Sequence, residues 1–356
     1  MAGLAALGVS GIAAAKSPTK TKTKYYSRQL SALPKGVSLS GKPYTPAVKR
    51  LKQTQTLTVG IPSKLELEAP VFLAYDEGEF AKEHLRINFV YDTVPDLLTL
   101  LGENKVDLVY AGAQAAVFNA LKAGVPIRWV SGVASAAPDS GLYMSDKYGT
   151  SSTFNPSVLK GLTIGVNPGG LAAPSEYGLY AALKKGHVSP SQITMVPFSN
   201  ISAMVSALNA GQLQGATVGP PYTAGITPGT AFQAEPGYPS TIQIAGYFAT
   251  TNLTKNHRAA GIAFFQAIER TINTYLHGNY HKDQIVMHLL SQELGTTTQQ
   301  LGAAPPVPFN LNIPPATLPA LQQMYATVPN TLSYSGLVKP SQLVDLSLVV
   351  DAAEGQ

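Results

Sequence analysis

From residue 57 onward, short apolar runs rich in β-branched residues alternate with amphipathic stretches. The run at residues 57–61 alternates and stops at Pro62, which predicts a strand. Apolar residues three and four positions apart, closed by Gly124, predict a helix over residues 114–123. The same signals predict further strands at 86–91, 106–110 and 126–130 and helices at 69–79 and 95–101.

A second stretch of the chain repeats this alternation. Ile201, Met204, Val205 and Leu208 have the i, i+3, i+4, i+7 spacing of one helix face. The predicted strands here are 162–166, 193–196 and 216–218, and a helix is predicted at 175–185. Strands alternating with helices favour mostly parallel sheets, so the sequence predicts two similar α/β lobes.

After residue 243 the pattern changes to a strand over 244–249, long helices over 258–276 and 283–294, and a Pro-rich stretch before a helix at 318–326. We expect the chain to cross between the lobes on strands near residues 142–145 and 246–250. The expected lobe 1 is residues 57–140 and 245–356, and the expected lobe 2 is residues 141–244.

The N-terminal region has a different composition. Residues 1–15 are apolar, rich in small residues and end in Ala13-Ala14-Ala15, which is typical of a secretory signal peptide; a buried helix is the alternative. The run is too short to span a membrane. Residues 16–56 hold ten Lys or Arg and no acidic residue, which predicts a linker. This segment is either solvated or in contact with the membrane or cell wall.

Charge and cysteine content exclude several classes of protein. The chain has 25 basic and 20 acidic residues, so the part outside residues 16–56 has 15 basic and 20 acidic residues and a net charge of −5. This balance argues against nucleic-acid binding by the folded body. The absence of cysteine excludes disulfides, thiolate metal sites and a cysteine nucleophile.

Four segments, taken in their order and spacing, carry a family resemblance. The pattern consists of residues 57–63 (LTVGIPS), 105–113 (KVDLVYAGA) running on to 123–127 (AGVPI), 159–170 (LKGLTIGVNPGG), and 207–216 (ALNAGQLQGA) followed by Pro220-Pro221-Tyr222. With it the chain resembles the sulfonate, taurine and nitrate-binding proteins of ABC importers, a branch that includes relatives of thiamine-pyrimidine proteins. It departs from them at Gly219, where an aromatic residue is usual, and at Gly215, where an acidic one is frequent.

The resemblance implies the two-lobed type II periplasmic-binding-protein fold with two crossing strands at the hinge. It implies an extracytoplasmic, monomeric protein that binds a small molecule, uses no cofactor or metal and delivers its ligand to an ABC permease. Because Pro, Gly and Tyr replace hydroxyl groups in the expected pocket, we expect a partly apolar ligand. An organic sulfonate or carboxylate is the first hypothesis and a neutral heterocycle the second.

Ligands of open α/β sheets bind beyond the carboxyl ends of the strands. Glycines and helix N-termini at four such ends offer backbone N–H groups to an anion, although ordinary turns need the same residues. The candidate ligand-binding residues are Pro62, Ser63, Lys64, Glu68, Gly112, Ala113, Gln114, Asp139, Asn167, Gly169, Gly170, Leu171, Pro221 and Tyr222.

Two alternatives belong to other classes of protein. An enzyme on the same fold, of the menaquinone or pyrimidine biosynthesis type, needs a carboxylate or histidine in the cleft, for which Glu66, Glu68 and Asp139 are the candidates. His277 and His281 are four residues apart, but the helix ends between them, so no metal pair is expected. The effector domain of a regulator needs a DNA-binding helix pair before residue 57, and the tail shows no such pattern. Trp129 is expected in the core.

Overall fold

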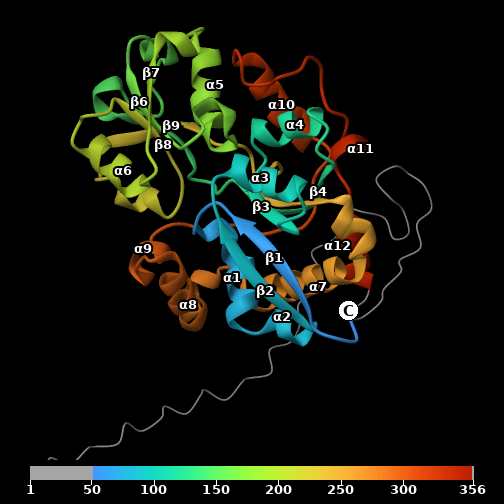
Figure 1. The fold of residues 1–356 in the computed structure, drawn as a ribbon. Coiled ribbons are helices and arrows are strands. Elements are labelled where there is room, and N and C mark those ends of the chain that lie inside the picture. Colours follow the sequence, from blue (N-terminus) through green and yellow to red (C-terminus); the bar gives the residue numbers. More distant parts are fainter. Residues whose placement is uncertain (1–50, 355–356) are drawn as a thin grey trace, which may run out of the picture.

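The computed structural model of the protein describes residues 51–354 (Figure 1). The predicted signal peptide and residues 16–50 of the predicted linker lie outside the described residues. The described chain forms two five-stranded sheets, each with helices on both faces, which confirms the predicted α/β class.

The first sheet has the strand order β2-β1-β3-β10-β4. β2, β1 and β3 are parallel, and β10 is antiparallel to both of its neighbours. Its strands are β1 (Gln55–Ile61), β2 (Leu85–Tyr91), β3 (Leu108–Gly112), β4 (Ile127–Ser135) and β10 (Gln243–Thr250).

The second sheet has the order β7-β6-β8-β5-β9. β7, β6 and β8 are parallel, and β5 is antiparallel to β8 and β9. Its strands are β5 (Gly141–Ser145), β6 (Thr163–Val166), β7 (Thr194–Pro197), β8 (Gly215–Val218) and β9 (Ala231–Pro236).

The two sheets therefore share one plan, in which a single antiparallel strand lies next to the edge strand. In each sheet that strand is the first one after the chain has crossed from the other sheet. We name the parts around the first and second sheets lobe 1 and lobe 2. The crossings are made by residues 136–140 and 237–242, slightly before the expected positions, which lie inside β5 and β10. We propose that the lobe boundaries fall in these two crossing segments.

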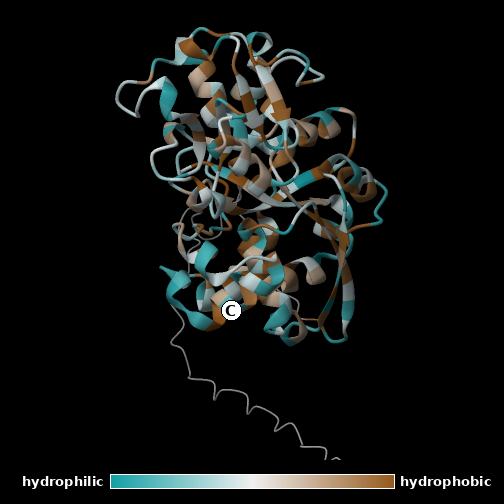
Figure 2. Cartoon of the chain, turned by 90° about the vertical axis from the view of Figure 1, so that its left-hand side faces the viewer, coloured by the Kyte–Doolittle hydropathy of each residue, from teal (hydrophilic) through white to brown (hydrophobic). Residues whose placement is uncertain are grey.

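The helices cover both faces of the sheets, and hydrophilic residues lie mainly on the outer helices and loops (Figure 2). No helix within residues 51–354 has the length and apolar character of a membrane span. The helices are α1 (Ala69–Asp76), α2 (Glu79–Lys82), α3 (Val94–Gly102), α4 (Ala115–Lys122), α5 (Tyr177–Lys185), α6 (Ile201–Asn209), α7 (Arg258–Tyr275), α8 (Gln284–Leu294), α9 (Thr298–Gly302), α10 (Thr317–Thr327), α11 (Pro340–Leu343) and α12 (Ser347–Glu354).

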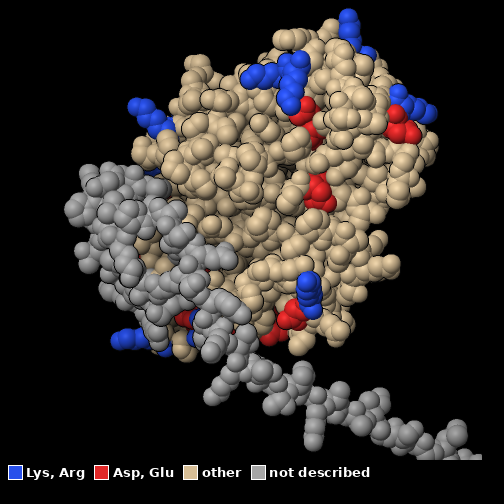
Figure 3. All heavy atoms as spheres, turned by 180° about the vertical axis from the view of Figure 1, so that it is seen from behind, with Lys and Arg blue, Asp and Glu red and all other residues tan. Residues whose placement is uncertain are grey.

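Charged side chains are sparse on the surface of the folded body. On the face in Figure 3 that grey atoms do not cover, Lys, Arg, Asp and Glu are separated by wide uncharged areas. No broad basic patch appears there, in line with the net charge of the chain outside residues 16–56.

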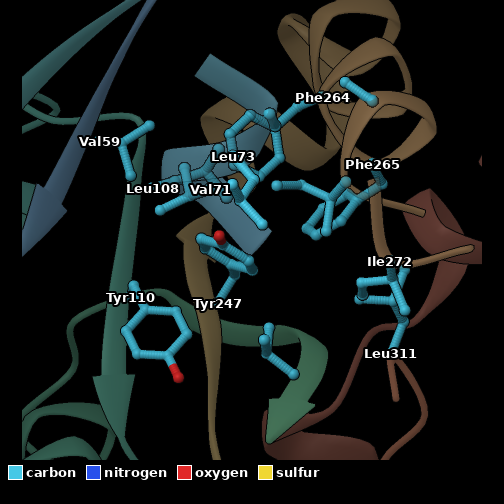
Figure 4. Close-up of a cluster of buried hydrophobic side chains, with 14 of the residues drawn as sticks. Val59, Val71, Leu73, Leu108, Tyr110, Tyr247, Phe264, Phe265, Ile272 and Leu311 are labelled. Carbon is cyan, nitrogen blue, oxygen red and sulfur yellow. The ribbon is translucent and has the colours of Figure 1, made fainter. Parts of the chain in front are cut away.

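The core of lobe 1 lies on both faces of its sheet because alternate strand residues point to opposite sides. Leu108 and Tyr110 pack into a cluster with α1, α7 and α8, whereas Val109 packs on the other side with α3, α4 and α10. Figure 4 shows part of the first cluster, with the rings of Tyr110, Tyr247, Phe264 and Phe265. Phe264 stacks on Phe80 with 5.1 Å between ring centroids.

The core of lobe 2 is smaller and consists of two separate clusters. One packs α5 against β5 and β6, and the other packs α6 against β8. Lobe 2 also touches lobe 1, because Tyr177 and Tyr180 of α5 pack on the cluster that holds α10. On the other side, α9 of lobe 1 contacts the turn Tyr222–Gly225 of lobe 2.

Candidate functional site

A cavity of about 130 Å³ lies where the two lobes and the crossing segments meet. Lobe 1 and the crossing segments contribute mostly apolar residues, whereas lobe 2 contributes most of the polar ones. The lining residues are Leu65, Leu67, Ile244 and Val307 of lobe 1, Ala136, Ala137, Ser140, Gly237 and Tyr238 of the crossing segments, and Asn167, Pro174, Ser175, Ile201, Thr217, Val218, Gly219, Pro220 and Tyr222 of lobe 2.

The lining residues of this cavity include no Asp, Glu, His, Lys or Arg. Its polar groups are hydroxyls, one side-chain amide and the backbone. The site therefore combines apolar contact with a few hydrogen-bonding positions, as small-molecule pockets commonly do.

A buried glutamate organises the lobe 2 wall. Glu176 is completely buried, and its Oε1 accepts hydrogen bonds from the Asn167 backbone N (3.0 Å), the Asn167 Nδ2 (3.0 Å) and the Ser175 Oγ (3.2 Å). Its Oε2 has no hydrogen-bond partner among the described residues. Burial raises the pKa of Glu176 to about 7, although hydrogen bonds from Thr217, Asn167 and Ser175 oppose the shift. This carboxyl therefore lies directly behind three cavity-lining residues.

A second buried carboxyl lies on the lobe 1 side. Glu68 accepts a hydrogen bond from the Leu65 backbone N at 2.9 Å and a longer one from the Ser63 Oγ at 3.4 Å. Burial raises its pKa to about 8. Burial and the charge of Glu68 also raise the pKa of Tyr222, which lines the cavity from lobe 2.

Glu66, on the same turn, belongs to a separate buried network. Its Oε1 lies 2.6 Å from the His281 Nε2 and also accepts a hydrogen bond from the Tyr280 hydroxyl. The His281 Nδ1 lies 3.0 Å from the Ala304 carbonyl oxygen, and the Val307 backbone N donates to the Tyr280 hydroxyl at 2.9 Å. Neither Glu66 nor His281 lines the cavity, so this network supports the wall from behind.

The crossing segments meet at Asp139 and Ser140. The Gly237 backbone N donates to the Ser140 carbonyl oxygen at 2.6 Å, which joins the two crossings. The Asp139 Oδ2 accepts a hydrogen bond from the Thr223 Oγ1 at 2.8 Å, while its buried Oδ1 has no partner within the described chain. Asp139 thus ties the first crossing to lobe 2 and does not itself line the cavity.

Of the predicted site residues, Asn167 and Tyr222 line the cavity. Ser63 and Glu68 lie behind its wall. Pro62, Lys64 and Pro221 neighbour it in sequence without lining it. Lys64 forms an exposed ion pair with Glu293 at 3.0 Å, and this hydrogen bond raises its pKa.

The glycine-rich loops that were expected to offer backbone N–H groups to an anion lie in contact between the lobes. An added Cβ at Gly112 would lie 3.4 Å from Pro174, and one at Gly169 would lie 4.0 Å from the Gln114 Oε1. Gly169 and Gly170 have φ angles of 97° and 50°, so the turn itself requires glycine. Gly112, Ala113, Gln114, Gly169, Gly170 and Leu171 do not line the cavity.

Four residues at the site were not predicted from the sequence, namely Glu176, Ser175, Thr217 and Tyr238. Tyr238 stacks on Tyr177 with 3.9 Å between ring centroids and closes one side of the cavity. The only signal for Glu176 and Ser175 was their position after Pro174 at the start of a predicted helix, which also fits an exposed first turn.

The described residues contain no group of three His, Cys, Asp or Glu side chains arranged to hold a metal ion. Trp129 is completely buried and stacks on Phe248 with 5.4 Å between ring centroids, which confirms its expected place in the core.

Comparisons with solved structures identify the fold. The alkanesulfonate-binding protein SsuA from Xanthomonas axonopodis pv. citri, bound to MOPS, superposes with a TM-score of 0.60 at 18% identity over 79% of this chain and 97% of its own. The periplasmic aliphatic sulphonate-binding protein SsuA from Escherichia coli gives 0.61 at 16% identity, over 79% and 96%. The periplasmic nitrate-binding protein NrtA from Synechocystis PCC 6803 gives 0.58 at 12% identity, over 85% and 89%.

These likenesses show that the protein has the two-lobed α/β fold of type II periplasmic binding proteins. A search of curated proteins found no match. A family model described as "NMT1/THI5 like" matches residues 68–277, more than half of the chain. The chain therefore belongs to the NMT1/THI5-like family.

Proposed function

We propose that the protein is an extracytoplasmic solute-binding protein that captures one small organic molecule and delivers it to the permease of an ABC importer. The observation that carries the proposal is the cavity with no charged lining residue whose walls come from both lobes. A ligand held there contacts both lobes at once, so it stabilises the closed arrangement by its differential affinity for it.

The connection between the lobes suits closure by a hinge. Only two chain segments, residues 136–140 and 237–242, cross between the lobes in the described chain, and a backbone hydrogen bond joins them. Hinge closure concentrates its φ/ψ changes in a few residues of this kind. The ABC permease would then distinguish the closed from the open form by the lobe surfaces. We expect one chain to suffice for this role.

An enzyme on the same fold is the alternative that the sequence left open. Acid–base chemistry needs a titratable side chain within hydrogen-bond reach of the substrate. The candidates Glu66, Glu68 and Asp139 all stand back from the cavity surface, and His281 is engaged with Glu66 and the Ala304 carbonyl. This arrangement supports binding over catalysis.

The proposal is tested by native mass spectrometry of the full chain after gentle purification from its own host. We expect one small molecule per chain, and its uptake by cells to fall when the gene is deleted. Gly219 lines the cavity, so the Gly219→Phe substitution fills it and should abolish retention, whereas Ala203→Phe on the exposed face of α6 should not. Chemical conversion of the molecule by the purified protein would favour the enzyme.

A further inference from the structure

We infer that the cavity takes a compact organic molecule whose polar end donates hydrogen bonds and carries no negative charge, such as an amine or an amidine. This inference rests on the proposed solute-binding function and adds the chemical class of the ligand. Three features of the cavity carry it: the use of the Asn167 and Ser175 donors within lobe 2, the absence of cations from its lining, and its apolar lobe 1 wall.

The Asn167 and Ser175 donors on the lobe 2 wall are already used. The Asn167 backbone N and Nδ2 and the Ser175 hydroxyl donate to Glu176, and the Asn167 Nδ2 also lies 3.4 Å from the carbonyl oxygen and the Oγ1 of Thr217. Because a carboxylate accepts and does not donate, Glu176 fixes the orientation of this amide and this hydroxyl. The Asn167 Oδ1 and the lone pairs of the Ser175 Oγ therefore remain as acceptors on this wall, and the Tyr222 hydroxyl can accept as well as donate.

The surroundings of the cavity also disfavour a negative charge. No Lys or Arg lines it to neutralise an anion. Behind its walls lie two fully buried carboxyls, Glu68 on lobe 1 and Glu176 on lobe 2. Moving a sulfonate or carboxylate out of water into this site would cost desolvation energy that no cation offsets. The anion hypothesis drawn from the glycine-rich loops also loses support, because those loops do not line the cavity.

The same surroundings favour a ligand that is positively charged or neutral and donates hydrogen bonds. An amine or amidine can donate to the acceptors on Asn167 and Ser175, with the Glu176 charge directly behind them. Leu65, Leu67 and Ile244 supply apolar contact for the rest of the molecule. The cavity of about 130 Å³ limits the ligand to a small ring or a short chain.

A matched series of probes tests the charge preference. Benzamidine, benzamide and benzoate share one ring and differ in the charge and donors of the polar group. Isothermal titration of the full chain at about pH 8 should give an affinity for benzamidine at least roughly tenfold above that for benzoate, with benzamide between them. Binding of benzoate equal to or tighter than that of benzamidine, or binding of none of the three, overturns the inference.

Two further measurements locate the effect at Glu176. The Glu176→Gln variant keeps an acceptor for Asn167 and removes the charge, so its benzamidine affinity should fall by about tenfold while its benzamide affinity stays within about twofold. Glu235→Gln is the matched control, because Glu235 is a buried glutamate of the same lobe that pairs with Lys185 and does not line the cavity. An unchanged benzamidine affinity in Glu176→Gln contradicts the assignment.

The wild-type chain gives a measurement that does not depend on a variant folding. A bound cation favours the ionised form of Glu176, so benzamidine binding near pH 7 should release protons and should tighten from about pH 6 to about pH 8. Titrations in buffers of different ionisation enthalpy measure this release, and its absence contradicts the role of Glu176. A retained natural ligand that proves to be an anion would overturn the ligand class and leave the solute-binding role intact, whereas no retained ligand would count against the role.

Discussion

The two walls of the interlobe cavity are built from different chemistry. The lobe 1 wall consists of Leu65, Leu67, Ile244 and Val307, and it rests on a continuous core rich in aromatic rings. The lobe 2 wall carries the side-chain amide and most of the hydroxyls, and the buried carboxyl of Glu176, which holds the amide, forms no ion pair within the described chain.

This difference suggests a division of labour between the lobes. Lobe 1 provides a rigid apolar base, because its wall stands on a close-packed core that is costly to deform. Lobe 2 has two smaller clusters and positions the groups that discriminate between polar ligands. Glu68 ties only its own loop, whereas Glu176 ties two side chains that face the ligand.

The largest expected effect is the loss of stability when the aromatic core beneath the lobe 1 wall is disrupted. Phe264 is completely buried and packs against Phe80, Tyr247 and Phe265. Phe264→Ala should lower the free energy of unfolding by about 3–5 kcal/mol, because it removes apolar contacts and leaves a cavity. Urea denaturation of the full chain measures the loss. Leu337→Ala, at an exposed leucine, should change stability by less than about 0.5 kcal/mol, and equal effects would refute the rigid-base interpretation.

The second largest effect is the pH dependence of stability that the two buried carboxyls, Glu68 and Glu176, should cause. Burial raises the pKa of Glu176 to about 7 and that of Glu68 to about 8 from a usual 4.5. The folded state therefore holds more protons than the unfolded state between these values, so the free energy of unfolding should fall as pH rises from 4.5 to 8. At about 1.4 kcal/mol per pKa unit, ionisation should lower the free energy of unfolding by roughly 3 kcal/mol for Glu176 and roughly 5 kcal/mol for Glu68.

Substitution by glutamine checks this dependence at each carboxyl. The Glu68→Gln and Glu176→Gln variants should each lose part of this decrease in the free energy of unfolding with pH. Each variant should therefore be more stable than the wild type above pH 8, and this difference should vanish below pH 4.5. Thermal denaturation across this range measures it. A wild-type stability that rises with pH through this window would mean that the carboxyls are ionised and paired in the folded chain.

A smaller effect is expected on ligand affinity when one residue of each wall is replaced by a residue of nearly the same shape or volume. Thr217 lines the polar wall, and its Oγ1 accepts a long hydrogen bond of 3.4 Å from the Asn167 Nδ2 beside Glu176. Thr217→Val should weaken benzamidine binding by about three- to tenfold, which corresponds to one hydrogen bond of about 1 kcal/mol. Leu67→Met on the apolar wall conserves volume and should change the affinity by less than about twofold. Isothermal titration measures the benzamidine affinity of both variants. A larger loss of affinity in Leu67→Met than in Thr217→Val would contradict the assignment of polar recognition to lobe 2.

Much of the fold followed from the sequence, because strand and helix periodicities are local. The repeated strand–helix order predicted two similar lobes, and the carboxyl ends of the strands pointed to Asn167 and Tyr222. β9 was missed because Gln233, Glu235 and Pro236 weaken its strand signal, and it pairs with β5 across an irregular register. Such an edge strand is defined by its partner more than by its own residues.

The site was harder to predict because it depends on which face of a turn is buried. After β1 the sequence favoured the polar residues Lys64 and Glu68, but Leu65 and Leu67 turn toward the cavity. Glu176 is a glutamate in a first helical turn, a position that is usually solvated. Its burial becomes visible only when the turn Pro174–Glu176 is packed beneath Asn167 and Thr217.

The smallest expected effect concerns the second crossing segment, where the two walls meet. Tyr238 stacks on Tyr177 of lobe 2, and its hydroxyl donates a long hydrogen bond of 3.3 Å to the Ala320 carbonyl oxygen of α10 in lobe 1. Tyr238→Phe keeps the stack and loses this weak bond and a 3.5 Å contact of the hydroxyl with the Met324 Sδ, so the free energy of unfolding should fall by less than about 1 kcal/mol. Tyr238→Leu loses the ring and should cost more. If Tyr238→Phe lowers the free energy of unfolding as much as Tyr238→Leu does, the hydroxyl and not the stacked ring stabilises the crossing segment between the lobes.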